Sequence, residues 1–212
     1  MNNGKLDLHP NRLFPADSKT RSIARALYAE IAKLPIISPH GHTDPKWWAT
    51  DANFGNASEL LLKPDHYVLR MLYSQGVPLE SLGVGNSEID PRAAWRQFAE
   101  HYYLFRGTPS RMWLDWVFAE VFAMEVRLSS ETSDMYFDKI TECLARPEFR
   151  PRALFERFSI EVITTTEDPL DPLQHHHTIR ESGWPGRVIT AYRPDSVIDP
   201  EFEGFHENLN KF

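Results

Sequence analysis

The sequence predicts an α/β protein built on a parallel β-sheet, and three observations lead to this fold class. Two segments, FSIEVITTT at 158–166 and RVITAYRP at 187–194, are rich in the β-branched and apolar residues that are typical of buried strands. A helix-like segment, LQHHHTIRESG at 173–183, lies between them, and a strand, helix and strand in close succession indicate parallel pairing. The apolar run IIS at 36–38 follows a helix that Pro35 ends, and it predicts an earlier strand of the same sheet.

Helices are expected on both sides of that first strand. Residues 17–34 carry apolar residues at helical spacing, and the region 56–150 contains further amphipathic segments separated by Gly, Pro, Asp or Ser. These segments are ASELLLK, DHYVLRMLYSQG, PRAAWRQFAEHYYLF, SRMWLDWVFAEVFAM and SDMYFDKITECLA. A last helix is expected to begin within 199–212. One set of aromatic residues recurs at a spacing that predicts a buried helix face: Trp113, Trp116, Phe118 and Phe122.

The expected elements divide the chain into three parts. Residues 1–55 form an arm, a helix and the first strand; 56–150 form a mainly helical insertion; and 151–212 form the second and third strands with their helices. A parallel sheet of three strands leaves its edges uncovered, and stable parallel folds use more strands. We therefore expect this sequence to be the front part of a longer fold.

Composition excludes several functional classes. The chain has 212 residues, a formal net charge of −7 and 42% hydrophobic residues, which suffice for a sizeable core. The acidic balance argues against nucleic acid as a partner, although one or two arginines can still bind a small anion. No apolar run approaches the roughly 18 residues of a membrane span, and the N-terminus lacks a secretory signal, so no membrane partner is expected. The single cysteine, Cys143, is expected on a helix face and indicates a reducing compartment, so the predicted location is cytoplasmic.

Two histidines, His40 and His42, follow the first predicted strand in the run SPHGHTDP. Residues i and i+2 of a strand point to the same face, so their imidazoles are expected to converge. Neutral imidazole suits zinc and neighbouring transition metals, and active sites of parallel barrels gather at the carboxyl ends of their strands. The alternative is two surface histidines in a loop, because two ligands do not complete a zinc site.

A second candidate cluster lies at the start of the segment DHYVLRMLYSQG. His66 and Tyr67 are adjacent, and Arg70 follows about one turn later. An imidazole, a phenol and a guanidinium together could supply an acid/base group and an anion clamp. The alternative is an ordinary helix N-terminus with an amphipathic aromatic residue.

Three polar groups lie at or after the later strands. The turn TTTEDP at 164–169 could supply supporting groups, but capping of a helix is its more common role. In the run His175-His176-His177, consecutive helical residues diverge by about 100°, so at most one or two would face any single point. Arg193 follows the third strand and would point towards the histidine pair if the strands are parallel, or would pair with Asp195 on the surface.

These segments, taken in order, resemble the uronate isomerase family, the glucuronate/galacturonate isomerase branch of the amidohydrolase superfamily. The resemblance combines the H-x-H pair, the run Asp65-His66-Tyr67-Val68-Leu69-Arg70 with Gly76-Val77, the turn Thr165 to Pro169, and Arg193-Pro194-Asp195. It extends from about residue 10 to residue 212. Each piece alone is weak evidence, whereas their order in one chain is specific.

The resemblance implies a (β/α)8 TIM-type barrel, incomplete in this chain, with a helical insertion after the first strand. It implies that His40 and His42 bind a divalent metal, with zinc expected, that His66 and Tyr67 contact the substrate and carry the catalysis, and that Arg193 helps to bind the substrate. The family's metal-binding aspartate and a neighbouring arginine come from late strands, so the remaining ligands are expected outside this chain.

The implied reaction is the conversion of D-glucuronate to D-fructuronate and of D-galacturonate to D-tagaturonate by proton transfer through an enediol. Tyr67 is the candidate proton shuttle, and Arg193 is the candidate contact for an anionic group. The implied partner is a small sugar acid, and self-association into a homo-oligomer is compatible with such barrels. Two alternatives remain: a metal-dependent hydrolase of the same superfamily, and an inactive fragment that needs its missing C-terminal part.

Overall fold

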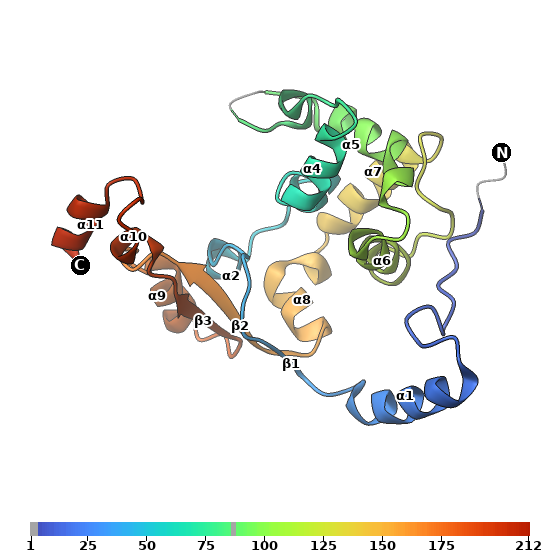
Figure 1. Ribbon diagram of the computed structural model, residues 1–212, viewed down its shortest axis with the longest axis horizontal. Coiled ribbons are helices and arrows are strands. Elements are labelled where there is room, and N and C mark those ends of the chain that lie inside the picture. Colours follow the sequence, from blue (N-terminus) through green and yellow to red (C-terminus); the bar gives the residue numbers. More distant parts are fainter. Residues whose placement is uncertain (1–3, 86–87) are drawn as a thin grey trace. The chain divides into compact units, whose positions relative to one another are not determined.

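Residues 4–85 and 88–212 are described by the structure, a computed structural model whose elements are labelled in Figure 1. The chain divides into two units. The helical unit contains residues 1–27 and 53–149, and the sheet unit contains residues 28–52 and 150–212.

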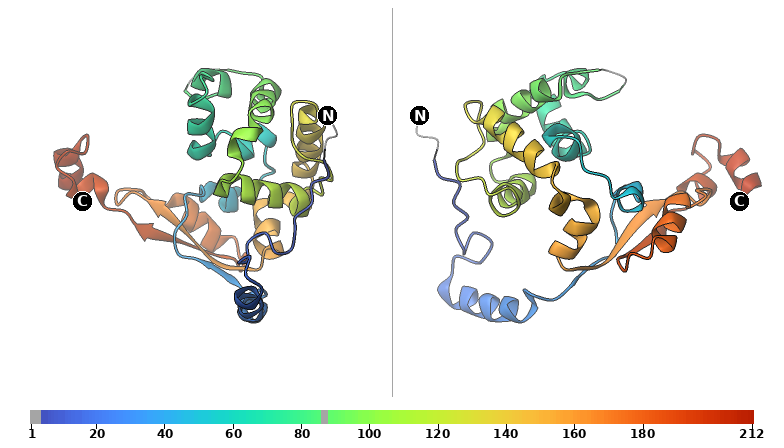
Figure 2. Two further views of the ribbon diagram at one scale, coloured as in Figure 1. Left: turned by 45° about the vertical axis from the view of Figure 1, so that its right-hand side comes forward. Right: turned by 180° about the vertical axis from the view of Figure 1, so that it is seen from behind.

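The sheet unit contains the predicted parallel sheet. Strands β1 (Ile36–Ser38), β2 (Ile160–Glu167) and β3 (Arg187–Tyr192) lie in the order β1-β2-β3, and both pairs are parallel. Helix α9 (Gln174–Glu181) connects β2 to β3 and lies alongside the sheet in both figures (Figures 1 and 2). The α/β class and the strand–helix–strand connection are therefore confirmed.

Burial differs along the sheet because β2 has a neighbour on each side. Its residues 162–165 are all buried, whereas β1 and β3 are largely exposed. This explains why the run VITT is apolar or β-branched throughout, as expected of a central parallel strand. Further helices complete the unit: α2 (Lys46–Thr50), α8 (Pro151–Arg157), α10 (Asp195–Ile198) and α11 (Phe205–Lys211).

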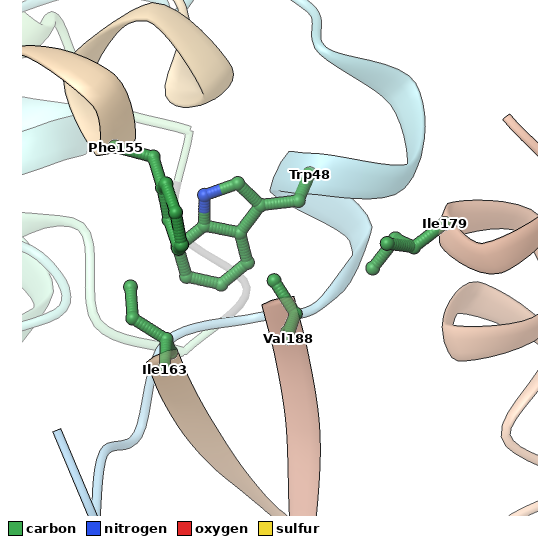
Figure 3. Packing of buried hydrophobic residues seen from close by; sticks show 5 residues of the cluster. All are labelled: Trp48, Phe155, Ile163, Ile179 and Val188. Atoms are coloured by element: carbon green, nitrogen blue, oxygen red, sulfur yellow. The ribbon is translucent and has the colours of Figure 1, made fainter. Parts of the chain in front are cut away.

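One apolar cluster joins three helices of this unit, α2, α8 and α9, to strands β2 and β3. Trp48 of α2 lies among Phe155 of α8, Ile163 of β2, Ile179 of α9 and Val188 of β3 (Figure 3). Burial of a large aromatic side chain is the dominant favourable contribution in such a small cluster. Helices α2 and α8, of five and seven residues, were not predicted from the sequence.

The helical unit confirms the helices expected within 56–150. Its elements are α3 (Ala57–Leu61), α4 (His66–Tyr73), η1 (Leu79–Leu82), α5 (Pro91–Glu100), η2 (Tyr102–Phe105), α6 (Pro109–Trp116), the π-helix η3 (Val117–Val121), α7 (Ser133–Leu144) and η4 (Pro147–Phe149). Aromatic rings fill the core, with Trp95, Phe98, Tyr102, Phe118 and Tyr136 each at most 1% exposed. Among the described helices, none is long and apolar enough to cross a membrane.

The prediction that four aromatic side chains of residues 113–122 are buried holds for only two of them. Phe118 and Phe122 are buried, but Trp113 and Trp116 are 39% and 40% exposed. The reason is the spacing itself: at about 100° per residue, Phe118 and Phe122 lie on the side of a helix opposite Trp113 and Trp116, so the four side chains do not share one face. Leu114 occupies the buried position of α6 instead.

The N-terminal arm groups with the helical unit. The backbone N–H of Leu6 donates to the carbonyl of Glu125 at 2.7 Å, and Lys5 and Val126 form an antiparallel bridge. The arm therefore belongs to the helical unit, whereas the sequence-based division into 1–55, 56–150 and 151–212 places it with the first strand. The sequence pattern does not reveal a backbone contact between residues so far apart in the chain. Helix α1 (Ser18–Ile31) lies where the sequence predicts it.

An ion pair between α5 and α7 gives the helical unit an expected acid sensitivity. The Nε and Nη2 atoms of Arg96 both donate to Asp134 at 2.9 Å, and these hydrogen bonds lower the pKa of Asp134. A depressed carboxyl pKa stabilises the fold above the unfolded value of about 3.9 and loses this contribution as pH falls through the folded value. We expect Asp134→Asn to lower the urea midpoint at pH 7, with the difference from wild type shrinking below about pH 4. Glu131→Gln, in the preceding turn, is the control; an equal effect of both changes at both pH values would contradict the assignment.

Candidate functional site

The histidine pair lies just beyond the carboxyl end of β1. The Nε2 atoms of His40 and His42 are 3.0 Å apart, and their rings meet edge to face with centroids 4.8 Å apart. Both side chains are exposed. The predicted convergence of the two imidazoles is therefore confirmed, whereas their role as metal ligands stays a prediction.

The pair fits one divalent metal. Zinc–imidazole bonds of about 2.0–2.1 Å place two tetrahedral nitrogen ligands roughly 3.3 Å apart, close to the separation found here. The next residue, Thr43, has a buried hydroxyl with no hydrogen-bond partner among the described residues, so a polar group beside the pair remains to be satisfied. Across residues 4–85 and 88–212, no group of three or more His, Cys, Asp or Glu could hold a metal ion. The pair could therefore supply only two ligands of a coordination shell.

Gly41 brings the segment between the histidines close to β2. A Cβ atom on Gly41 would lie 3.2 Å from the carbonyl oxygen of Thr164, which is tighter than an ordinary van der Waals contact. On the same side, the hydroxyl of Thr166 donates to the carbonyl of Gly41 at 2.8 Å. Close backbone approach of this kind is a recognised reason for glycine next to a strand.

A hollow of about 330 Å³ opens beside His42. It is lined by residues of the loop after β1, the end of β2 and the start of α9: His42, Thr43, Asp44, Pro45, Thr166, Glu167, Asp168, Asp171 and His175. Two of its carboxylates serve the backbone, because Asp168 accepts from the N–H of Leu170 and Asp171 from that of Leu173. Asp168 therefore closes a local turn, and the predicted helix capping is wrong, because α9 begins only at Gln174 and its N-cap residue, Leu173, makes no side-chain capping hydrogen bond.

A buried polar cluster supports the opposite face of the β2 terminus. The hydroxyl of Thr165 donates to Glu167 Oε2 at 2.9 Å, and His176 Nε2 lies 3.2 Å from Thr165 Oγ1 and 3.4 Å from Glu167 Oε2. The side chains of Glu167 and His176 are only 8% and 7% exposed. Of the three consecutive histidines, His176 is thus the buried one. Sequence reasoning did not identify this cluster, although the i, i+2 spacing of Thr165 and Glu167 was a usable signal.

The second candidate cluster belongs to the helical unit. Asp65 caps α4 by accepting from the N–H groups of Tyr67 and Val68 at 2.9 and 3.2 Å. The rings of His66 and Tyr67 lie 4.2 Å apart between centroids, and the Tyr67 side chain is 64% exposed. The start of this capped helix therefore exposes both side chains to solvent. That they act together with the histidine pair stays a prediction.

Arg193 directly follows β3, at the same end of the parallel sheet as the histidine pair. Since β2 lies between β1 and β3, these groups are separated by roughly 10 Å of strand spacing. Arg193 Nε donates to Asp195 Oδ2 at 2.9 Å, and both side chains are more than half exposed. The surface pair with Asp195 is therefore present, and a substrate contact by Arg193 stays a prediction.

Comparison with known proteins places these features in a family. The chain matches the glucuronate isomerase family (UxaC) over residues 17–212. A uronate isomerase of Rhizorhabdus wittichii is 70% identical over 206 residues, which cover 97% of this chain and 44% of the relative. A uronate isomerase of Sphingopyxis alaskensis is 67% identical over 211 residues, which cover 98% of this chain and 45% of the relative. The chain thus spans less than half the length of these relatives.

Solved structures agree with the sequence comparisons. The crystal structure of glucuronate isomerase from Caulobacter crescentus matches with a TM-score of 0.94 at 58% identity, covering 98% of this chain and 44% of that chain. The uronate isomerase from Thermotoga maritima matches with a TM-score of 0.81 at 26% identity, covering 90% of this chain and 41% of that chain. The similarity extends through both units and confirms the resemblance that the ordered motifs indicated. The chain therefore belongs to the glucuronate isomerase family.

Proposed function

We propose that this chain forms part of an aldose–ketose isomerase that converts D-glucuronate to D-fructuronate and D-galacturonate to D-tagaturonate. The observation that carries the proposal is the match to the glucuronate isomerase family over residues 17–212. The convergent imidazoles of His40 and His42 beside a polar hollow support it, because they supply a place where sugar oxygens can be bound.

The reaction sets three requirements on the site. A base removes the proton from C2 while O1 gains a proton, which gives an enediol; the enediol then loses the O2 proton and gains a proton at C1. The carbonyl oxygen must be polarised as charge develops on it, and the carboxylate of the sugar acid must be held. No atoms are lost or gained overall: one group can return at C1 the proton that it takes from C2, and the proton that O1 gains is balanced by the one that O2 loses.

The described residues can meet these requirements. His40 and His42 would hold a divalent metal, and zinc is the expected ion because it accepts imidazole ligands. The bound metal would polarise substrate oxygens. Tyr67 is the candidate proton shuttle, and His66, stacked near it, would orient the phenol or the sugar. Arg193 would bind an anionic group of the substrate, which would replace Asp195 as the partner of the guanidinium.

A (β/α)8 barrel would complete this arrangement, and the exposed sheet edges support that part of the proposal. Ile37 of β1 and Tyr192 of β3 are 61% and 62% exposed, so both outer strands present apolar side chains to solvent. Relatives twice as long as this chain have enough residues for additional strands and for the remaining metal ligands. Within this proposal the protein acts in the cytoplasm on small sugar acids, without nucleic acid or membrane, and self-association of the complete barrel is compatible with it.

The test is a chimaera in which this chain replaces the matched segment of the R. wittichii relative. We expect the chimaera to convert D-glucuronate to a ketose of the same mass, observed by NMR, because the two segments are 70% identical. Release of two products would instead favour a metal-dependent hydrolase. Folded chimaera without any conversion would overturn the proposal for this chain.

A further inference from the structure

The end of β2 is fixed on both of its faces by polar side chains. Thr166 points to one face and donates to the carbonyl of Gly41 at 2.8 Å. Its neighbours Thr165 and Glu167 point to the opposite face, where they meet His176 of α9. Two structural elements that are distant in sequence, the loop after β1 and helix α9, are therefore joined to the same short piece of strand.

The histidine segment needs such an attachment because β1 is short. The strand pairs with β2 at Ile36, Ile37 and Ser38, and the register shifts between the first two residues. Beyond Ser38 the chain leaves the regular ladder, yet Gly41 still lies against the backbone of Thr164. The hydrogen bond from Thr166 holds the peptide that links the two histidines, so it acts directly on the spacing of their rings.

The buried cluster on the other face gives this attachment a rigid base. Thr165 is fully buried, and its hydroxyl also lies 3.2 Å from the carbonyl of Ile189 on β3. Glu167 accepts from Thr165 and faces His176, and both acidic and imidazole side chains are more than nine-tenths buried. Buried polar groups whose hydrogen bonds are satisfied hold one geometry, because breaking them leaves desolvated groups without partners.

We propose that Thr166 is a positioning residue for the His40–His42 pair, and that the Thr165–Glu167–His176 cluster fixes the strand terminus from which Thr166 acts. The inference rests on the proposed role of the pair in metal binding and extends it to residues on β2. It predicts that Thr166 influences metal affinity without touching the metal, through its hydrogen bond to the backbone between the two histidines.

The test compares substitutions at Thr166 in the 212-residue chain, with Zn²⁺ affinity measured by competition with a chromogenic chelator. His40→Ala defines the binding that depends on the pair. Thr166→Val keeps the β-branched shape and removes the hydroxyl, so we expect this component to weaken by about 10- to 100-fold with the urea midpoint changed little. Thr166→Ser restores the hydroxyl and is expected to recover most of the affinity.

A matched control comes from the neighbouring strand. Thr190 of β3 is exposed, and its hydroxyl is directed to the carbonyl of Ala191, so Thr190→Val makes the same chemical change away from Gly41. We expect Thr190→Val to leave Zn²⁺ affinity at the wild-type value. Glu167→Gln keeps the side-chain volume but weakens the contact with His176, and it is expected to lower the affinity less than Thr166→Val.

The outcomes separate this inference from the proposed function. Wild-type affinity in Thr166→Val, equal weakening by Thr190→Val, failure of Thr166→Ser to recover, or absence of His40-dependent binding in the wild type would each overturn the positioning role. A chimaera that lacks isomerase activity, combined with the expected order of affinities, would overturn the proposed reaction and leave the positioning role supported.

Discussion

Replacing His42 by alanine is expected to lower both the metal content and the isomerase turnover of the chimaera by at least about 100-fold, because losing a hydrogen-bond partner of a metal ligand already costs 10- to 100-fold. Losing a ligand itself costs more, since the 3.0 Å pair would become a single imidazole. Metal per protomer after dialysis, determined by mass spectrometry, and the turnover number measured on the same sample check this expectation. His42 is exposed, so its removal leaves the apolar core untouched and the fold intact.

A second histidine provides the control for adventitious binding. His177 on α9 is also exposed, lies outside the hollow beside His42 and contacts Arg180. His177→Ala is expected to keep the metal content and turnover of the unsubstituted chimaera. If His42→Ala retained both properties as well, the pair would be two surface histidines and the proposed metal centre would be wrong.

The sequence predicts the regular elements well where local physical chemistry decides them. The continuous apolar and β-branched run of β2 reflects its burial between two strands. The helices of the 56–150 region show their repeat because each has one buried face. The H-x-H spacing predicts convergence because residues i and i+2 of a strand point to one face, and the rings converge although both histidines lie just beyond the end of β1. These inferences need no knowledge of distant contacts.

The sequence does not predict features that depend on distant partners. The burial of His176 depends on Thr165 and Glu167, which belong to a different element, and nothing in the run of three histidines distinguishes it from its neighbours. Trp113 and Trp116 share one face of their helix, and only the packing of the folded unit decides that the opposite face, with Leu114 and Phe118, is the buried one. The attachment of Gly41 to Thr166 spans 125 residues and becomes visible only when the strands are paired.

The phenol of Tyr67 is the second group whose removal is expected to have a large effect. We expect Tyr67→Phe to lower the turnover number of the chimaera by about 10²- to 10⁴-fold, the usual contribution of a positioned acid/base group. Phenylalanine keeps the ring that lies 4.2 Å from that of His66, and the exposed hydroxyl has no place in the core, so folding should not change. Because the substitution removes a proton carrier rather than a binding surface, KM is expected to change much less than the turnover number.

Helix α4 supplies a control of the same type for this experiment. Tyr73 lies on the same helix and is 62% exposed, close to the 64% of Tyr67, so Tyr73→Phe removes an equally solvated phenol. We expect Tyr73→Phe to leave the turnover number unchanged. Exchange of the C2 proton of D-glucuronate with deuterated solvent is expected to be lost in Tyr67→Phe and kept in Tyr73→Phe. Near-normal turnover in Tyr67→Phe would mean that another group carries the proton. A rise in KM alone would assign the phenol to substrate binding, because binding lost equally in the ground and transition states leaves the turnover number unchanged.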